Sequence, residues 1–545
     1  MKFDGVFKYT GKYGRYHRQI THIVCLVIIT NTFTNISTVF LNGTMDHFCK
    51  DTDNTTNTNC SASDYEFGIA NNILPPDDKN TPFINETMCR MYTGDVDGVN
   101  NNETELASCE HGWTYDRSMY RSTIVSEFDL VCEDSYKVSL AASSFLFGYF
   151  FGSIVFGGIC DYFGRKRGIL IALALKILMG TLCAIAPSYW TYFVFRLLNG
   201  TMNIGLYISV FVYVTEFVAP SKRAMISAIA YVYWSIGFLF LAGIAYFVRS
   251  WRTFYLIVSL SPAPLLIVYL FIPESPRWLL LKNRPKEAKK ILQKIAKVNK
   301  KNFPDDVVDN IEVQNNPQRE LKRASFVSIF RFSNMRKKTL ILIYCWLTTT
   351  LVYYGLTYGV ESLNLNIYIA TSLGGVTELL ATFFTWFAIQ RFGRRWMLVF
   401  FFNAAGILCF LIIWIPTHME ALRTALSMAG RFFVTSTFSL IYTFTCELYS
   451  TDVRSIGLGI CSFMSRVAGV LAPQLLFLEK LWTPLPLVTF SAASVSAGIL
   501  AILLPETLNF PLPQTVEEAE LVTRQTNQRL SAKDFHELSV KPEQP

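Results

Sequence analysis

Asp161-Tyr162-Phe163-Gly164-Arg165-Lys166-Arg167 is a short charged stretch that returns 229 positions later as Gln390-Arg391-Phe392-Gly393-Arg394-Arg395. Two other stretches return in the same order, 231 and 232 positions later. They are Thr215-Glu216-Phe217, which returns as Cys446-Glu447-Leu448, and Pro273-Glu274-Ser275, which returns as Pro505-Glu506-Thr507. Three ordered pairs at nearly one spacing indicate a chain built from two similar halves.

Most of each half has the composition of a membrane protein. Hydrophobic residues make up 51% of the chain and charged residues 17%, whereas soluble domains carry about 25% charged residues. Twelve apolar stretches have the length of about 20 residues that a helix needs to cross a bilayer. They span 20–41, 137–159, 168–187, 190–213, 224–247, 254–272, 338–358, 365–389, 396–415, 422–446, 456–478 and 485–504. Because helices satisfy their own backbone in lipid, we predict an all-α membrane protein with twelve transmembrane helices in two repeated six-helix halves.

The basic residues predict the orientation of these helices. Lys and Arg gather in the N-terminus and in the short loops on the same side, which the positive-inside rule places in the cytoplasm. Arg249 and Arg252 lie on the outer side and break the rule locally. We therefore expect a plasma-membrane protein with both termini inside. The predicted parts are a cytoplasmic N-terminus (1–19), an N-terminal half (20–272), a basic cytoplasmic loop (273–337), a C-terminal half (338–504) and a cytoplasmic tail (505–545).

The basic loop contains a predicted amphipathic helix. Residues 273–338 include 17 Lys and Arg against 7 Asp and Glu. From Pro285 onward, Ile291, Leu292, Ile295 and Val298 form an apolar stripe beside a lysine-rich face. We expect this helix to lie on the cytoplasmic membrane surface. The positive-inside rule already accounts for the basic charge, so it does not indicate a nucleic-acid partner.

The loop at about 42–136 has the composition of an extracellular segment. It holds 18 Asp and Glu against 5 Lys and Arg. Asn-x-Ser/Thr triplets are predicted glycosylation sites, and they occur at Asn42, Asn54, Asn59, Asn85 and Asn102. Five cysteines are predicted to form disulfides in an oxidising compartment, with one left over and the connectivity open. They are Cys49, Cys60, Cys89, Cys109 and Cys132.

These features resemble the major facilitator superfamily over residues 10–510, and more narrowly solute carrier family 22, the organic cation, anion and zwitterion transporters. The resemblance rests on the long cysteine-bearing loop together with three short motifs. The motifs are Pro273-Glu274-Ser275-Pro276-Arg277-Trp278-Leu279, Cys446-Glu447-Leu448-Tyr449 and Leu504-Pro505-Glu506-Thr507. The family usually has a basic residue where this chain has Tyr162. The resemblance implies a transporter that works by alternating access, with a small organic ion and the lipid bilayer as partners.

Charged residues at the cytoplasmic helix ends are predicted to form a gate. We expect ion pairs among them to lock the two halves together when the transporter faces outward. The predicted gate residues are Asp161, Arg165, Glu216, Arg223, Glu274, Arg277, Glu447 and Arg454.

Five charged residues lie deeper in the predicted helices, where ionisable groups are costly and usually functional. Lys176 can snorkel, Arg196 suits an interfacial anchor, and the role of Arg431 stays open. Glu378 and Arg466 lie near the middle of helices eight and eleven. We predict that both contact the substrate, and the alternative is a structural ion pair between them. In the family, cation carriers have an acid at the position of Arg466, whereas anion and zwitterion carriers have Arg.

The resemblance favours a substrate with charges of both signs. Cation and zwitterion carriers have Glu at the position of Glu378, and anion carriers typically have Lys four residues on, where this chain has Thr382. A carnitine-, betaine- or ergothioneine-like zwitterion is the preferred substrate, and an organic anion is the main alternative. Matching the pocket positions of the family predicts aromatic lining residues that suit a quaternary ammonium. They are Tyr207, Tyr231, Trp346, Tyr353 and Phe438.

Other classes of function have less support. The sequence shows no nucleophile–base arrangement, no metal-ligand spacing and no phosphate loop, so we expect no enzyme activity, metal or cofactor. A sugar porter is expected to have a short first loop, and a receptor on the same scaffold need not keep both gates. The sequence leaves open a coupling ion, sodium or proton, and the oligomeric state.

Overall fold

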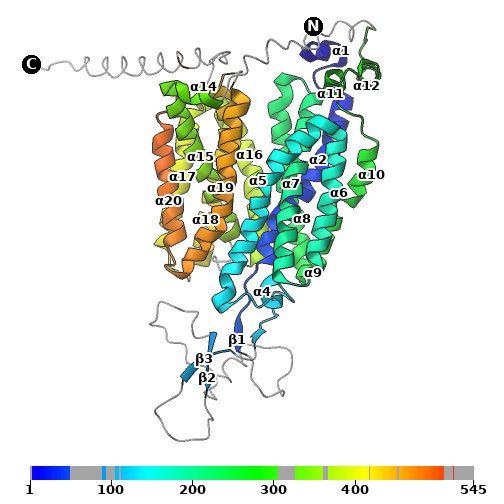
Figure 1. Ribbon diagram of the computed structural model, residues 1–545. Helices are drawn as coiled ribbons and strands as arrows, with labels where there is room; N and C mark the ends of the chain where they lie inside the picture. Colours follow the sequence, from blue (N-terminus) through cyan, green and yellow to red (C-terminus); the bar gives the residue numbers. More distant parts are fainter. Residues whose placement is uncertain are drawn as a thin grey trace, which may run out of the picture.

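The computed structural model describes residues 3–49, 89–93, 105–109, 112–304, 326–359, 366–416, 418–450, 453–507 and 520. These residues form a helical bundle with two small two-stranded sheets at one end (Figure 1). β1 (His47–Cys49) pairs antiparallel with β4 (Trp113–Tyr115), and β2 (Arg90–Thr93) with β3 (Glu105–Ser108). We call this end the loop end. The opposite end, the basic end, carries α1 (Phe7–Thr10), α11 (Pro276–Leu281), α12 (Pro285–Val298) and α14 (Phe326–Arg331).

The first half has six membrane segments. They are α2 (Arg15–Leu41), α5 (Tyr136–Phe163), α6 (Arg165–Ala184), α7 (Tyr189–Phe217), α8 (Arg223–Phe247) and the pair α9 (Trp251–Leu260) and α10 (Ala263–Leu270). The sequence predicted the last as one helix over 254–272, and the structure corrects this. The helix breaks at Ser261 and Pro262, because proline lacks an N–H group and its ring clashes with the preceding turn.

The second half repeats the pattern beside the first (Figure 1). Its segments are α15 (Ser333–Tyr358), α16 (Ile367–Phe392), α17 (Arg395–Ile413), α18 (Glu420–Leu448), α19 (Arg454–Phe477) and α20 (Leu485–Ala501). Ten spans among the described residues are long and apolar enough to cross a membrane. α18 and α20 complete the twelve predicted segments.

The repeated motifs make the same contacts in each half. Gly164 and Gly393 both have positive φ, at 104° and 88°, which favours glycine. A glutamate lies beside each glycine. It accepts hydrogen bonds from main-chain N–H groups at the start of the helix that follows the glycine. Glu274 Oε1 accepts from the amides of Arg165 and Lys166, both at 3.0 Å. Glu506 accepts from those of Arg394 and Arg395, at 2.9 and 3.1 Å.

An arginine–glutamate pair beside each glycine also repeats. Arg165 Nη2 lies 2.9 Å from Glu216 Oε1 in the first half, and Arg394 Nε lies 3.2 Å from Glu447 Oε2 in the second. The sequence repeat is therefore a structural repeat, in which charged groups join three helices of the same half.

The apolar stripe of the predicted amphipathic helix packs against other parts of the protein. Leu292 and Ile295 of α12 are 3% and 2% exposed, and they join a hydrophobic cluster that includes Val6, Tyr16 and Leu279. Asn299 donates from Nδ2 to the carbonyl of Thr10 at 2.8 Å. The apolar stripe is covered by α11, α1 and α2, so it is not the face that lies on lipid.

Glu274→Ala is expected to destabilise the first half. Because the substitution leaves the amides of Arg165 and Lys166 without their acceptor, it should cost about 2–4 kcal/mol. The measurement is thermal unfolding of the purified protein in detergent. Glu287→Ala is the matched control, since Glu287 is exposed and pairs only with Arg284 at the basic end. Equal melting temperatures for the two variants would contradict this role of Glu274.

Candidate functional site

A buried ion pair lies in the core of the second half. Glu378 Oε1, on α16, accepts hydrogen bonds from Arg431 Nη2 on α18 at 3.1 Å and from the Tyr353 hydroxyl on α15 at 2.6 Å. Trp234 of α8 also lies near this carboxylate. The side chains of Arg431 and Glu378 are 2% and 4% exposed. A charge buried to this degree needs such partners, and the protein itself supplies them to Glu378.

Arg466 is in a different environment. It lies near the middle of α19, is partly exposed, and places its guanidinium 5.6 Å from the centre of the Tyr149 ring. Its Nη2 donates a long hydrogen bond of 3.5 Å to Ser462 Oγ, and its Nε has no hydrogen-bond partner. No carboxylate pairs with Arg466 in the part of the chain that the structure describes. The guanidinium interacts electrostatically with the phenols of Tyr149, Tyr207, Tyr354 and Tyr442.

The structure therefore contains an ion pair that differs from the predicted alternative. The sequence left open a structural pair between Glu378 and Arg466, but the carboxylate pairs with Arg431. Arg431 is also held against the ring of Phe238 of the first half, 4.8 Å from its centre. Arg466 takes no part in this pair.

The predicted aromatic residues lie together but differ in exposure. Phe438 is 5.6 Å from Tyr353 and 6.4 Å from Trp346 between ring centres. Trp346 is 1% exposed and donates to Thr445 Oγ1 at 2.9 Å, so it packs in the core. Tyr353 is buried against Glu378. Phe438, Tyr207 and Tyr231 are partly exposed.

Tyr207 and Tyr231 of the first half lie near Tyr442 of the second. Tyr442 stacks edge-on against Trp346 at 4.3 Å. Tyr149, Tyr354 and Tyr442 were missed by sequence reasoning. Tyr354 adjoins Tyr353, and Tyr442 lies one turn after Phe438, so helical spacing was the signal available for those two.

The chain is similar to known transporters over almost its whole length. The family described as "Sugar (and other) transporter" matches residues 24–518. Solute carrier family 22 member 1 of Bos taurus is 35% identical, with 96% of this chain and 93% of the relative covered. The organic cation transporter protein of Drosophila melanogaster is 33% identical, with 95% of each covered. Solute carrier family 22 member 2 of Homo sapiens is 32% identical, with 96% and 95% covered.

The chain belongs to solute carrier family 22. It is a transporter and not an enzyme, as the sequence predicted. Among solved structures, the xylose transporter XylE from E. coli in an inward-open conformation aligns with a TM-score of 0.60. That alignment covers 93% of this chain and all of XylE, at 15% identity. At this identity the likeness shows the fold alone, and the fold is the predicted major facilitator architecture.

The other two deep charges of the transporter are buried in the first half. Lys176 Nζ donates to the Thr30 carbonyl at 3.1 Å and to Asn31 Oδ1 at 2.6 Å. Arg196 Nη2 donates to Thr38 Oγ1 at 2.7 Å, and its guanidinium lies 4.4 Å from the centre of the Phe145 ring. Both are 1% exposed. The structure thus corrects the snorkelling and interfacial positions expected for Lys176 and Arg196.

Several of the predicted gate charges pair inside their own half in this conformation. Arg165 contacts Asp161 at 3.1 Å as well as Glu216. Arg454 Nη2 donates to the Tyr449 carbonyl at 3.4 Å. Arg223 and Arg277 also have interactions within the protein. Among the described residues, no ion pair joins the two halves at the basic end, so locking between the halves stays a prediction for the opposite conformation.

The two halves meet toward the loop end. Ser143 Oγ of α5 donates to the Val470 carbonyl of α19 at 2.7 Å. Tyr368 of α16 stacks on Phe40 of α2, with 5.8 Å between ring centres. These contacts close the loop end, while the ion pairs at the basic end stay within each half. This arrangement is that of a carrier closed on the side of the long loop.

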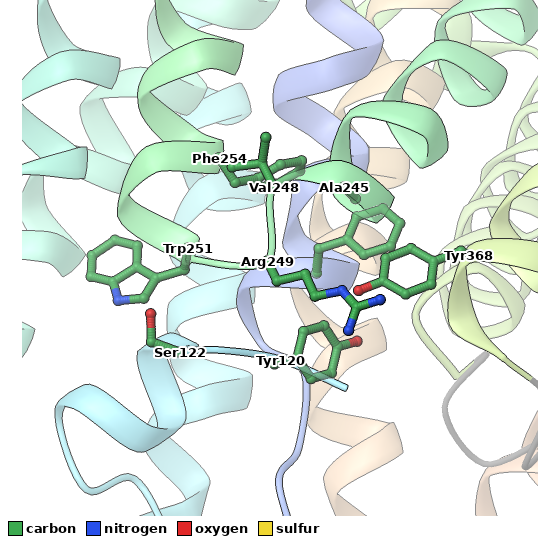
Figure 2. A pocket seen from close by; sticks show the side chains of 9 residues that line it. Tyr120, Ser122, Ala245, Val248, Arg249, Trp251, Phe254 and Tyr368 are labelled. Carbon is green, nitrogen blue, oxygen red and sulfur yellow. The ribbon is translucent and has the colours of Figure 1, made fainter. Parts of the chain in front are cut away.

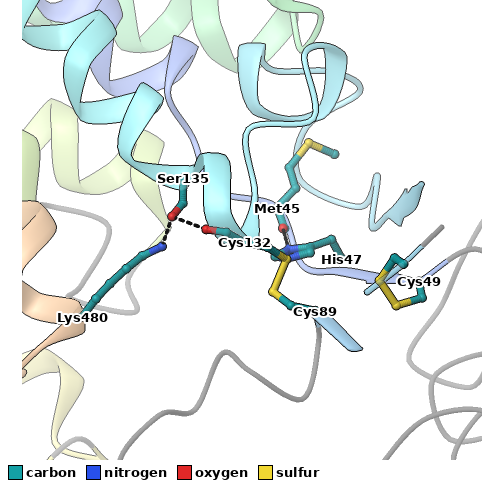
Figure 3. The surroundings of a disulfide bond; sticks show 8 residues. Met45, His47, Cys49, Cys89, Cys132, Ser135 and Lys480 are labelled. Carbon is teal, nitrogen blue, oxygen red and sulfur yellow. Dashed lines mark hydrogen bonds between the residues drawn. A yellow bond between two sulfur atoms is a disulfide. The ribbon is translucent and has the colours of Figure 1, made fainter. Parts of the chain in front are cut away.

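Two disulfides staple the loop. Cys49 pairs with Cys109 and Cys89 with Cys132, which gives the connectivity that the sequence left open. Figure 3 shows His47 beside the second bridge, 3.9 Å from Cys132 Sγ. Among the described residues, these three are the only group close enough to hold a metal ion, but both sulfurs are used in the disulfide. Burial lowers the pKa of His47, which favours a neutral imidazole.

One predicted glycosylation site lies in the described region. Asn42 Nδ2, the atom that would carry a glycan, donates to the Val138 carbonyl at 3.1 Å. Because Nδ2 carries two hydrogens, this contact leaves the predicted glycosylation of Asn42 a prediction. Asn54, Asn59, Asn85, Asn102 and the remaining cysteine, Cys60, lie outside the described residues.

Arg431→Met should be strongly destabilising, because it leaves the Glu378 carboxylate buried without its cation. We expect a loss of about 3–5 kcal/mol, and Glu378→Gln in the same protein should recover much of it. Thermal unfolding and surface delivery would be measured for the single and double variants. Arg466→Met is the matched control and should change stability little. A larger loss for Arg466→Met than for Arg431→Met would show that the ion pair is misassigned.

Proposed function

We propose that the protein transports small organic ions that carry a carboxylate, by alternating access between its two halves. The observation that supports this most is Arg466, a partly exposed guanidinium in the membrane core without a carboxylate partner among the described residues. A guanidinium binds a carboxylate through two parallel hydrogen bonds, which gives both affinity and orientation. Glu378 is already neutralised by Arg431 and contributes no free negative charge.

The preferred substrates are zwitterions of the carnitine, betaine or ergothioneine type. In this proposal the carboxylate binds Arg466 and the cationic end faces aromatic rings. Tyr207, Tyr231, Phe438 and Tyr442 come from both halves and are partly exposed. Aromatic faces attract a quaternary ammonium without a carboxylate, with a contribution of about 0.5–2 kcal/mol per ring. Glu378 then acts through Arg431 and Tyr353 and makes no direct contact with the ammonium.

An organic anion is the second proposed substrate class. The Glu378–Arg431 pair favours an anionic substrate, because Arg431 neutralises the only acidic side chain deep in the described membrane helices. Lys176, Arg196 and Arg466 are left as basic groups without acidic partners among the described residues. The relatives named organic cation transporters support transport of small organic ions. A simple cation would face the uncompensated guanidinium of Arg466, so cation transport is the less favoured alternative.

The proposed setting is the plasma membrane, with the basic end and both termini in the cytoplasm. The lysine- and arginine-rich segments at that end support this orientation through the positive-inside rule. The disulfides of the loop end support an oxidising, extracellular compartment there. The described conformation then faces the cytoplasm. The predicted cytoplasmic gate would form in the outward-facing state.

Radiotracer uptake tests the proposed function. Carnitine, ergothioneine, a dicarboxylate and tetraethylammonium would be compared in cells that express the chain, with and without sodium. Uptake of the zwitterions, with little uptake of tetraethylammonium, is the expected result. Uptake of the dicarboxylate alone would support the organic-anion alternative. Uptake of tetraethylammonium alone would contradict the role of Arg466.

Arg466→Gln should raise the KM for carboxylate substrates about tenfold or more, since a charge-assisted bidentate contact contributes about 1.5–3 kcal/mol. Arg466→Asp should shift selectivity toward tetraethylammonium. Uptake kinetics would be measured at matched surface expression. Lys480→Gln is a control for charge alone, because Lys480 lies at the loop end of the bundle. Unchanged selectivity in a surface-delivered Arg466→Asp variant would contradict the placement of Arg466 in the substrate site.

A further inference from the structure

Two arginines at the loop end break the positive-inside rule, and the structure accounts for only one of them. Arg252 Nε pairs with Glu127 Oε1 at 2.6 Å, and its other nitrogens donate to the carbonyls of Ala184 and Ala186 at 2.8 and 2.7 Å. It fastens α9 to the end of α6. Arg249 makes one hydrogen bond of 3.3 Å to the Ser118 carbonyl. It is exposed and has no carboxylate partner within the described residues.

Arg249 lies at the rim of a pocket where three parts of the protein meet (Figure 2). The long loop contributes Tyr120 and Ser122, and the connection from α8 to α9 contributes Arg249. The second half contributes Tyr368. The remaining walls are mainly aromatic or apolar side chains of the first half. They are Phe40, Ala245, Val248, Trp251 and Phe254.

Tyr368 of the second half packs against residues of the first half. Its ring stacks on Phe40 at 5.8 Å and meets Tyr246 edge-on at 5.6 Å, while its hydroxyl donates to the Met119 carbonyl at 3.4 Å. It is 7% exposed and interacts electrostatically with Arg249. Among the pocket-lining residues, Tyr368 is the only one from the second half.

Alternating access must separate these surfaces. When the loop end opens, α16 moves away from the first half and takes Tyr368 with it. Arg249 then faces the extracellular medium beside the aromatic rings that Tyr368 had covered. Tyr368 lies ten residues before Glu378 on α16, a rise of about 15 Å along the helix. The opened pocket is thus well separated from the central site.

We propose that Arg249 and the aromatic side chains around it form an outer recognition site for the carboxylate of an incoming substrate. In the described conformation Tyr368 covers this site. The proposal rests on the proposed function, because the ligand is the same carboxylate that Arg466 binds in the centre. A guanidinium beside aromatic walls suits a small carboxylate with an apolar or quaternary-ammonium body. An exposed positive charge at the mouth also raises the local concentration of anionic groups.

Uptake kinetics of the full-length transporter test this site. Arg249→Gln should raise the KM for external carnitine or a dicarboxylate three- to tenfold, leave kcat unchanged, and weaken the dependence of kcat/KM on ionic strength. Arg249→Lys should fall between Arg249→Gln and the wild type. Arg121→Gln is the control, since Arg121 is an exposed arginine of the long loop that is not among the residues lining the pocket. Inhibition of uptake by tetraethylammonium should be the same in all four proteins.

The outcomes separate this site from the proposed function. If the wild type takes up no carboxylate compound, the proposed function fails and the outer site fails with it. If the wild type takes them up and Arg249→Gln has the same KM, only the outer site is overturned. An equal rise of KM in Arg121→Gln would also overturn it, because the effect would then come from surface charge in general. Arg249→Lys provides the test if Arg249→Gln does not reach the cell surface. A wild-type KM in Arg249→Lys, together with uptake that does not depend on ionic strength, would then count against the site.

Discussion

The pairing of Glu378 with Arg431 determines which charge the centre of this transporter presents. A carboxylate in the membrane core has to be compensated by the protein, and here Arg431 and Tyr353 supply that compensation at 3.1 and 2.6 Å. Arg466 has no such partner among the described residues. The free charge between the halves is therefore positive, although the sequence contains one acid and two arginines at this depth. The proposed carboxylate substrate follows from this asymmetry.

A second set of charged contacts makes each half a unit that can move as one body. Glu274 and Glu506 each accept main-chain hydrogen bonds at the start of the next helix, and Arg165 and Arg394 pair with Glu216 and Glu447 of their own half. These contacts stay within a half, whereas the halves are joined by single hydrogen bonds and aromatic contacts, such as Ser143 with Val470 near the loop end and Arg431 with Phe238 deeper in the bundle. The weaker contacts are the ones that alternating access has to break.

The repeat, the twelve membrane segments and the family could be predicted because each depends on local patterns. Apolar stretches fix the segments, and short charged motifs at one spacing fix the repeat. The break at Pro262 was in principle readable from proline chemistry, but the apolar pattern continues through it. The position of α12 was not readable, because an apolar stripe fits protein and lipid equally well and only the fold shows which of them covers it.

Only part of the central site could be predicted from the sequence. Depth in a helix shows that Glu378, Arg431 and Arg466 all lie within the membrane segments, and it gives no information on which face of the helix each side chain occupies. The partner of Glu378 therefore had to come from the structure. Tyr149 carried no sequence signal, since its importance arises from the packing of α5 against α19 beside Arg466.

The role of Arg466 can be tested most directly by solving the structure of the protein with bound carnitine in a lipid nanodisc. The account predicts carboxylate oxygens within about 3 Å of the Arg466 guanidinium, with the Glu378–Arg431 pair intact and the trimethylammonium group against aromatic rings. A structure in which the ammonium contacts Glu378, with Arg431 displaced and Arg466 distant from the ligand, would contradict it.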